Sequence, residues 1–250
     1  MKAASAGNAN NGMLRRSFLV LSVVAFVGCS SHTPYSTRVG LLDPGSALTV
    51  VVSSANVNVY KPAEGQASDQ YTVSATALEN TNPPAPAIEH AGNGVVVRAT
   101  DPLYGLLVRL PDRVNLVVQS NKGNVNVTDV HGSVDVRAGD GNVRIMVPGV
   151  AQAQTTTGDI DATIGATQWS GTLKFVANAG DVTVFVPEIA KFHVRLHTDD
   201  GTIFTDFGLH GTSVGNNETI DAPVNGGGSY GVDIESHRGT VRLLRLTPQA

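Results

Sequence analysis

The chain contains little cysteine, few aromatic residues and few charges. Cys29 is the only cysteine among 250 residues, so no disulfide framework can form within the chain. Aromatic residues make up 5% of the sequence and charged residues 15%. No apolar run reaches the roughly 18 residues that a membrane-spanning helix needs. The sequence therefore excludes a disulfide-stapled domain and predicts no spanning helix.

The longest apolar run lies near the N-terminus and is too short to span a membrane. Residues 18–27 read FLVLSVVAFV and follow the basic pair at 15–16. A basic segment followed by a short apolar core is typical of a secretory signal peptide. Residues 26–29, FVGC, resemble the bacterial lipobox, in which a lipid-modified cysteine follows the cut. We expect residues 1–28 to be removed and Cys29 to carry the lipid.

The residues around Cys29 indicate how the mature chain is exported and attached. Several acyl chains, such as palmitate, give stable attachment because each buried methylene contributes about 0.8 kcal/mol. Ser30 in place of aspartate resembles the sorting pattern for the outer membrane of Gram-negative cells. Residues 15–19, RRSFL, fit twin-arginine export as well as the general secretory route. Residues 29–45 are predicted to be a lipidated tether.

The expected mature chain is acidic and rich in strand-forming residues. Residues 1–28 hold three basic and no acidic side chains, which leaves 14 basic and 21 acidic ones. A net charge of −7 argues against nucleic acid or anionic lipid as a partner, because both require a basic face. Valine, glycine, threonine and asparagine abound, and this composition favours strands and turns.

One short phrase recurs along the second half of the chain: a glycine, a small polar residue, then apolar residues at alternate positions. The alternation predicts strands with one buried and one solvated face. The glycine supplies a backbone angle that other residues reach only at a cost. Reuse of one turn residue favours stacked coils, with a sandwich of hairpins as the alternative. The phrase begins at Gly123, Gly132, Gly141, Gly158, Gly171, Gly180, Gly201 and Gly239.

These patterns predict an all-β protein. Residues 113–250 form a single-stranded, right-handed-type β-solenoid of stacked short strands, whose number of sides stays open. Residues 46–112 form a less regular N-terminal β cap, since an open end would expose unpaired strand groups. Residues 206–230 hold six glycines, show no alternation and are predicted to be a loop insertion. Long loops are often functional, so this insertion is a candidate binding surface, with a flexible bulge as the alternative.

Residues 108–246 resemble a known family. They are similar to the bacterial putative-adhesin family, a domain of unknown function also described as a toast-rack β-solenoid. The resemblance implies a non-enzymatic envelope domain and brings no catalytic residues to carry over. The phrases that carry it are VRLPDRVNLVVQSNKGNVNV (108–127), TTTGDIDATI (155–164), GDVTVFVPEIAKFHVRLHTDDGTI (180–203) and GGGSYGVDIESHRGTVRL (226–243).

One stretch fits a hydrolase motif. Residues 211–215, GTSVG, match G-x-S-x-G with Ser213 as nucleophile, and Asp221 or Asp233 and then His237 follow in hydrolase order. The motif works when a strand delivers the serine into the start of a helix, and the mature chain shows no helical pattern. We therefore predict no catalytic residue.

Two groups of residues suggest metals. His193 and His197, with Asp199 nearby, would lie about 13 Å apart on the outer face of a strand, too far to share one zinc ion. Asp159 and Asp181 follow equivalent glycines and would share Ca²⁺ if their coils were adjacent. Elsewhere the same slot holds other polar residues, which favours a hydrogen-bonded turn ladder (Asn124, Asn142, Thr202 and Thr240). We predict no metal and no cofactor.

Together these observations predict a non-enzymatic, lipid-anchored β-solenoid of the bacterial cell envelope. We expect an adhesin-like, scaffold or interaction module whose polar face contacts an envelope protein or a glycan. Two alternatives stay open. A polysaccharide-acting β-helix enzyme would need acids and bases that converge in a cleft, and an envelope-stress sensor component would share the fold and differ in its partner.

Overall fold

The computed structural model describes residues 35–76, 83–99 and 105–246, and its regular elements in these ranges are all strands. The leader and Cys29 lie outside the described residues. The described part contains no helix long and apolar enough to cross a membrane. The strands form two long sheets, one of ten strands (sheet A) and one of eleven (sheet B).

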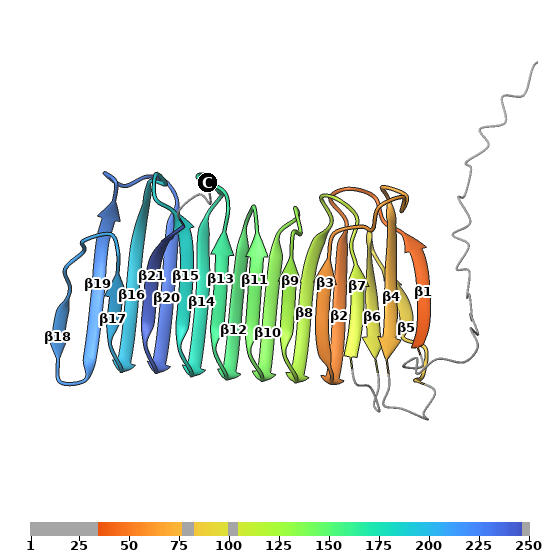
Figure 1. Cartoon of the computed structure of the whole chain (residues 1–250), viewed down its shortest axis with the longest axis horizontal. Helices are drawn as coiled ribbons and strands as arrows, with labels where there is room; N and C mark the ends of the chain where they lie inside the picture. Colours follow the sequence, from red (N-terminus) through yellow and green to blue (C-terminus); the bar gives the residue numbers. More distant parts are fainter. Residues whose placement is uncertain (1–34, 77–82, 100–104, 247–250) are drawn as a thin grey trace, which may run out of the picture.

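The middle of the molecule is a regular stack of two-sided coils. In each coil a strand of sheet B turns through a glycine arch into a strand of sheet A, and neighbouring coils pair in parallel (Figure 1). The predicted solenoid is therefore confirmed, and each coil has two sides. The central coils are β8–β9 (Asn115–Lys122, Val125–Thr128), β10–β11 (Val134–Asp140, Val143–Val147), β12–β13 (Ala151–Thr157, Ile160–Ile164) and β14–β15 (Thr172–Ala179, Val182–Pro187).

At both ends the coils do not follow the order of the sequence. The coil β2–β3 (Ala47–Ser54, Asn56–Tyr60) lies between β8–β9 and the later coil β6–β7 (Gly94–Ala99, Gly105–Arg109). The last coil, β20–β21 (Gly231–Arg238, Val241–Leu246), lies between β14–β15 and β16–β17 (Phe192–Asp200, Ile203–Thr205). Each terminal coil of the sequence is thus enclosed by two others.

Antiparallel strands close the two ends of the stack. At the N-terminal end these strands are β1 (Tyr35–Leu41), β4 (Gln70–Thr76) and β5 (Ala87–Ala91). The sequence analysis assigned residues up to 45 to a tether, and this is wrong for β1, which pairs with β4 along its length. The predicted cap over residues 46–112 also includes β2, β3, β6 and β7, which continue the parallel sheets.

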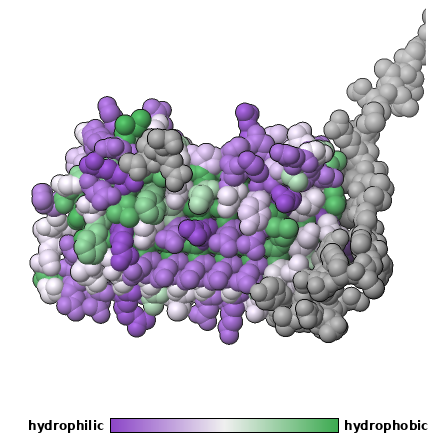
Figure 2. Space-filling model, viewed as in Figure 1, coloured by the Kyte–Doolittle hydropathy of each residue, from purple (hydrophilic) through white to green (hydrophobic). Residues whose placement is uncertain are grey.

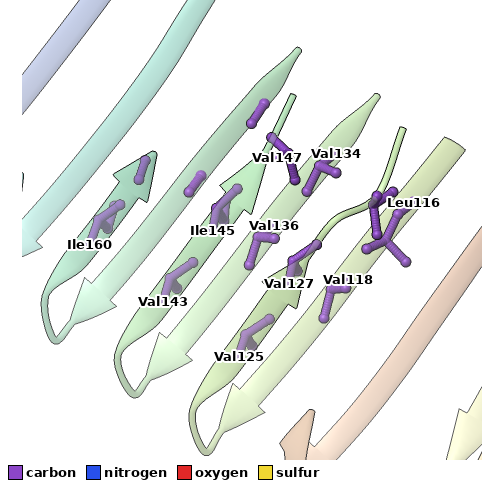
Figure 3. Close-up of a cluster of buried hydrophobic side chains, with 14 of the residues drawn as sticks. Leu116, Val118, Val125, Val127, Val134, Val136, Val143, Ile145, Val147 and Ile160 are labelled. Atoms are coloured by element: carbon purple, nitrogen blue, oxygen red, sulfur yellow. The ribbon is translucent and has the colours of Figure 1, made fainter. Parts of the chain in front are cut away.

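The core consists of aliphatic side chains that alternate along every strand and stack from coil to coil. Val125, Val143 and Ile160 occupy matching positions on three adjacent coils and are buried (Figure 3). Each fully buried side chain of this size contributes about 1.5–3 kcal/mol by leaving water. The alternation in the sequence predicts this face because successive strand residues point to opposite sides.

The C-terminal end is closed by residues that the sequence analysis placed in a loop. Residues 206–230 include β18 (Thr212–Val214) and β19 (Asn217–Val224), and β19 pairs antiparallel with β16. Phe207 contacts the edge of Phe192 at a ring distance of 5.9 Å, and the Arg245 guanidinium lies 5.4 Å from the Phe207 ring centre. The prediction of an irregular loop is therefore wrong, and the segment covers the end of the core.

Candidate functional site

The glycine arches carry a ladder of hydrogen bonds between coils. Asp159 donates its backbone N–H to Asn142 Oδ1 at 2.9 Å, and Asp181 donates to Asp159 Oδ1 at 2.8 Å. Thr240 in turn donates to Asp181 Oδ1 at 2.8 Å. Asn124 and Asn56 continue the series on the other side. This is the predicted turn ladder, in which Oδ1 of Asp159 and Oδ1 of Asp181 each accept a backbone N–H from the next coil.

Asp181 also forms an ion pair within this ladder. Burial alone would raise the pKa of Asp181, but the Thr240 amide and the Arg242 guanidinium hold that pKa below its ordinary value. Arg242 Nη1 donates to Asp181 Oδ2 at 2.8 Å. Asp181 therefore stays ionised and pins the last coil of the sequence, which contains both partners, to the coil beside it.

The outer face of sheet B carries many polar side chains, among them His193, His197 and Asp199. Parallel pairing aligns these side chains in rows that cross the strands. One row consists of Asp135, Gln152, Lys174, Asp233 and Arg195, on β10, β12, β14, β20 and β16. The row beside it consists of Arg137, Gln154, Val176, Glu235 and His197 on the same strands.

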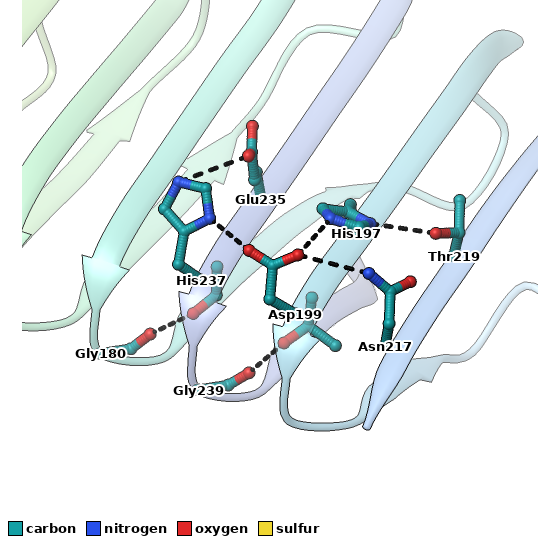
Figure 4. Close-up of polar contacts among 10 residues, drawn as sticks. Gly180, His197, Asp199, Asn217, Thr219, Glu235, His237 and Gly239 are labelled. Carbon is teal, nitrogen blue, oxygen red and sulfur yellow. Dashed lines mark hydrogen bonds and ion pairs between the residues drawn. The ribbon is translucent and has the colours of Figure 1, made fainter. Parts of the chain in front are cut away.

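On the C-terminal part of this face the polar groups contact one another. Asp199 Oδ2 lies 2.6 Å from His237 Nδ1, and Asp199 Oδ1 lies 3.0 Å from His197 Nε2 (Figure 4). Asn217 donates to Asp199 Oδ1, and His197 Nδ1 lies 3.0 Å from the Thr219 hydroxyl. The hydrogen bond with His237, and then that with His197, hold the pKa of Asp199 below its ordinary value. This cluster links β19, β16 and β20.

A second cluster ties β19 to β16. His193 Nε2 lies 2.6 Å from Asp221 Oδ1, and Arg195 Nε donates to Asp221 Oδ2 at 3.4 Å. The hydrogen bond with His193 is the main cause that lowers the pKa of Asp221, and Arg195 adds to it. Both clusters hold β19 beside β16 and stabilise this arrangement of the last strands. Within each cluster the polar atoms bond to one another.

The two histidines considered as metal ligands lie on the outer face of β16, as predicted. His193 and His197 face outward on either side of Arg195. His197 and Asp199 do meet, and the third member of their cluster is His237, which comes from β20. This contact could not be predicted from the sequence, because it depends on where β20 enters the sheet. Among the described residues no group of histidine, cysteine and acidic side chains has the geometry to hold a metal ion.

The residues of the hydrolase motif do not assemble. Ser213 lies on the exposed strand β18 opposite Glu218, and the motif leads into strand β19 instead of a helix. Asp221 pairs with His193, while His237 contacts Asp199. The structure thus separates Ser213, Asp221 and His237 into different contacts.

The middle of the face differs, because its polar side chains lie in two adjoining depressions. The first, of about 350 Å³, is lined by Arg137, Gln154, Lys174, Val176 and Glu235 among others. The second, of about 540 Å³, is lined by Gln152, Lys174, Arg195, Tyr230 and Asp233 among others. Lys174 borders both. Glu235 lines the first depression and Asp233 the second, and both lie on the outer face of β20.

A smaller, mostly apolar depression of about 150 Å³ lies among the loops that join the coils. His131 bridges Asp112 and Asp129 there, with its ring nitrogens 2.6 and 3.5 Å from their carboxylates. Lys61 also pairs with Asp129, and this hydrogen bond is the main cause that lowers the pKa of Asp129. Each charged group has a partner within the cluster, which favours a role in joining the loops.

The outer face of sheet A is less polar. Figure 2 shows a band of hydrophilic residues along one long edge of the molecule and a more hydrophobic area above it. Met146, Thr163, Phe185 and Leu244 form one row across sheet A, and Met146 is 45% exposed. The row beside it on sheet A is polar and consists of Asn126, Arg144, Asp161, Thr183 and Arg242.

The repeated arches, the two-sided coils and the polar face agree with the comparison to known proteins. A family model described as Toastrack DUF4097 matches residues 108–244. The chain belongs to the Toastrack DUF4097 family. The resemblance noted in the sequence is confirmed, and the match begins in β7, so the coil β2–β3 and the N-terminal cap precede it.

Two solved structures are similar to this Toastrack chain. A "putative cell adhesion protein" from Clostridium sporogenes ATCC 15579 is 12% identical, with a TM-score of 0.46 over 85% of this chain and 100% of that chain. A "putative adhesin" from Bacteroides fragilis NCTC 9343 is 10% identical, with a TM-score of 0.41 over 88% of this chain and 100% of that chain. These likenesses carry no information on function. No curated protein matches the chain.

Proposed function

We propose that this Toastrack protein is a non-enzymatic, adhesin-like interaction module that presents the outer face of sheet B to an envelope protein or glycan. The observation that carries the proposal is the contrast within that face. Polar side chains on β16, β19 and β20 bond to one another. By contrast, the side chains of Gln152, Gln154 and Lys174 bond to no described residue, and they line two depressions. Unpaired polar side chains in a depression are the groups that a ligand would satisfy.

A stacked solenoid suits such a role because it holds a surface in fixed positions. Every outward side chain on β10, β12 and β14 is spaced by parallel pairing on both sides of its strand. A partner would meet a preformed array and would not have to order a loop, which reduces the entropic cost of binding.

The lipid anchor is part of the same proposal. Cys29 precedes β1 by six positions, so the chain between them reaches at most about 20 Å. Lipid on Cys29 would therefore hold the N-terminal end of the stack close to the membrane, in our proposal the outer membrane. The nine strand spacings of sheet A would extend the stack by roughly 43 Å from β1 to β17.

Metabolic labelling tests the anchor. An alkyne-tagged fatty acid is supplied to cells that express the wild type or the variant Cys29→Ser. We expect the wild type to be labelled and to remain in the membrane fraction. The variant should be unlabelled and should be absent from the membrane fraction. Equal labelling of the two proteins would remove Cys29 as the attachment point.

Capture of partners tests the binding face. Intact envelopes are crosslinked and the protein is purified as the wild type, as Gln154→Tyr and as the control Thr163→Tyr, which adds the same bulk to sheet A. A defined partner that the wild type and the control capture, and Gln154→Tyr loses, supports the proposal. The absence of any partner in all three samples would contradict it. Deletion of residues 206–230 is a poor variant, because that segment closes the end of the core.

A further inference from the structure

The two depressions on sheet B share one charged residue, Lys174. Lys174 is half-buried, and its side chain makes no hydrogen bond or ion pair with any described residue. Its neighbours in the row are Gln152 on β12 and Asp233 on β20. Of the other cations that line the depressions, Arg137 pairs with Asp135 and Arg195 pairs with Asp221. An ammonium group that is partly shielded from water gains most from an anionic partner brought by a ligand.

The groups around Lys174 are those that bind sugars. Gln152, Gln154 and Asn178 offer amide donors and acceptors, and none of them is bonded to a described residue. Val176 lies in the same depression and gives an aliphatic surface on which the C–H face of a sugar ring can rest. Tyr230 is an aromatic residue in the lining of the second depression.

The spacing of the strands also fits a chain of sugars. Adjacent strands lie about 4.8 Å apart, close to the length of one pyranose residue along a polysaccharide. A saccharide chain that runs across β10, β12, β14 and β20 would thus meet one strand per sugar. Each sugar would lie above the side chain at the equivalent position of its strand.

The charge of the surroundings limits how acidic the ligand can be. Asp135, Asp233 and Glu235 all lie within the two rows that cross the depressions. These carboxylates repel a densely charged polyanion such as a sulfated glycan, while one free ammonium accepts a single carboxylate. The ligand should therefore carry isolated carboxylates on an otherwise neutral chain.

We infer that the face formed by β10, β12, β14 and β20 binds a saccharide chain bearing sparse carboxylate groups, with one carboxylate on Lys174. This inference rests on the proposed function, whose partner it narrows to a glycan. Lys174 acts as the anionic subsite, and the amides of Gln152, Gln154 and Asn178 bond to hydroxyl and acetamido groups.

Titration with matched sugars tests the inference. The probes are hyaluronan hexasaccharide, which has one carboxylate in every second sugar, and fully N-acetylated chitohexaose, a neutral chain of similar shape. Amide chemical shifts of the purified chain are followed in low salt up to millimolar sugar. We expect hyaluronan to bind more tightly than chitohexaose by roughly fivefold to tenfold, and both to shift residues of β12 and β14.

The variant Lys174→Gln should remove the preference for hyaluronan while leaving the free energy of unfolding unchanged, because the lysine has no partner to lose. Lys122→Gln, on the exposed end of β8, is the control and should keep the preference. Equal affinity of the wild type for both sugars, no shift with either sugar, or an unchanged preference in Lys174→Gln would overturn the inference. If neither sugar shifts the wild type while Gln154→Tyr loses a protein partner that the wild type captures from envelopes, the glycan inference fails and the proposed function stands.

Discussion

Gly239 lies directly beside Gly180 in the stack, although 59 residues separate them in the sequence. A β-carbon on Gly239 would lie 2.2 Å from the Gly180 carbonyl oxygen. On its other side Gly201 makes the same close approach to the Gly239 carbonyl oxygen, at 2.0 Å. The arch of the last coil is therefore enclosed by the arches of two coils that precede it in the sequence. Strands β20 and β21 fill the position between β14–β15 and β16–β17.

The same close approach makes the arch glycines intolerant of a side chain. Gly158 has φ +126°, and a β-carbon there would lie 2.4 Å from the Gly141 carbonyl oxygen. We expect Gly158→Ala to lower the free energy of unfolding by about 1–3 kcal/mol from backbone strain, with a further loss from the clash. Gly149→Ala is the matched control, since nothing lies within 4 Å of its β-carbon. Urea denaturation of the two variants measures the difference, and similar midpoints would contradict the close packing of the arches.

The side-chain ladder beside the glycines gives a second prediction. Asn142→Ala leaves the Asp159 amide without its acceptor, and we expect a loss of about 1 kcal/mol in the free energy of unfolding. Asn142→Asp keeps an acceptor oxygen, as Asp159 and Asp181 do in the same slot. This variant should therefore be close to the wild type in a denaturant titration at neutral pH. A loss as large as that of the alanine variant would show that the amide group matters more than the acceptor.

The cluster around Asp199 should make stability depend on pH in the acid range. Its hydrogen bonds to His237 and His197 hold the pKa of Asp199 below the ordinary 3.8. A carboxylate with a lowered pKa in the folded state stabilises the fold above its ordinary pKa and loses that effect as the pH falls through the folded value. We expect the wild type to have a higher urea midpoint than Asp199→Asn at neutral pH, with the two converging in acid.

Asp161→Asn is the control for this experiment, because Asp161 is exposed on β13 and bonds to no described residue. Its midpoint should follow that of the wild type across the whole pH range. A gap between the wild type and Asp199→Asn that stays constant into acid would show that ionised Asp199 contributes nothing to the fold.

The segment that closes the C-terminal end is expected to act as a cap. Phe207 packs against Phe192 and beneath Arg245, so Phe207→Ala should cost about 2 kcal/mol in the free energy of unfolding. Phe204→Ala should cost less, because Phe204 is 55% exposed. Hydrogen exchange would then show faster opening of β16 and β19 in Phe207→Ala. Unchanged protection of these strands would mean that the segment is dispensable for the fold.

The solenoid could be predicted from the sequence because its signals are local. Strand alternation and the arch glycine repeat in the coils from β8–β9 onward, so Gly141 and Val143 identify their own coil without knowledge of the others. The position of β20 could not be predicted in this way, since its neighbours β14 and β16 are set by pairing across distant segments. The cluster of Asp199 with His237 was missed for that reason.

Strand β19 was missed for a different reason. Its inward residues Ile220, Ala222 and Val224 do alternate, but alanine is a weak apolar signal. Pro223 argues against a central strand because it lacks the N–H that pairing requires. The structure accepts this proline because β18 pairs only with residues 217–219, which leaves that side of Pro223 free of a neighbouring strand.

Site-specific photocrosslinking in intact envelopes tests most directly whether the outer face of sheet B is the binding surface. A photoreactive residue replaces Gln154 in one variant and Thr163 of sheet A in the other. We predict a discrete crosslinked product from position 154 and none from position 163. A product from position 163 alone, or no product from either position, would contradict this account of the face.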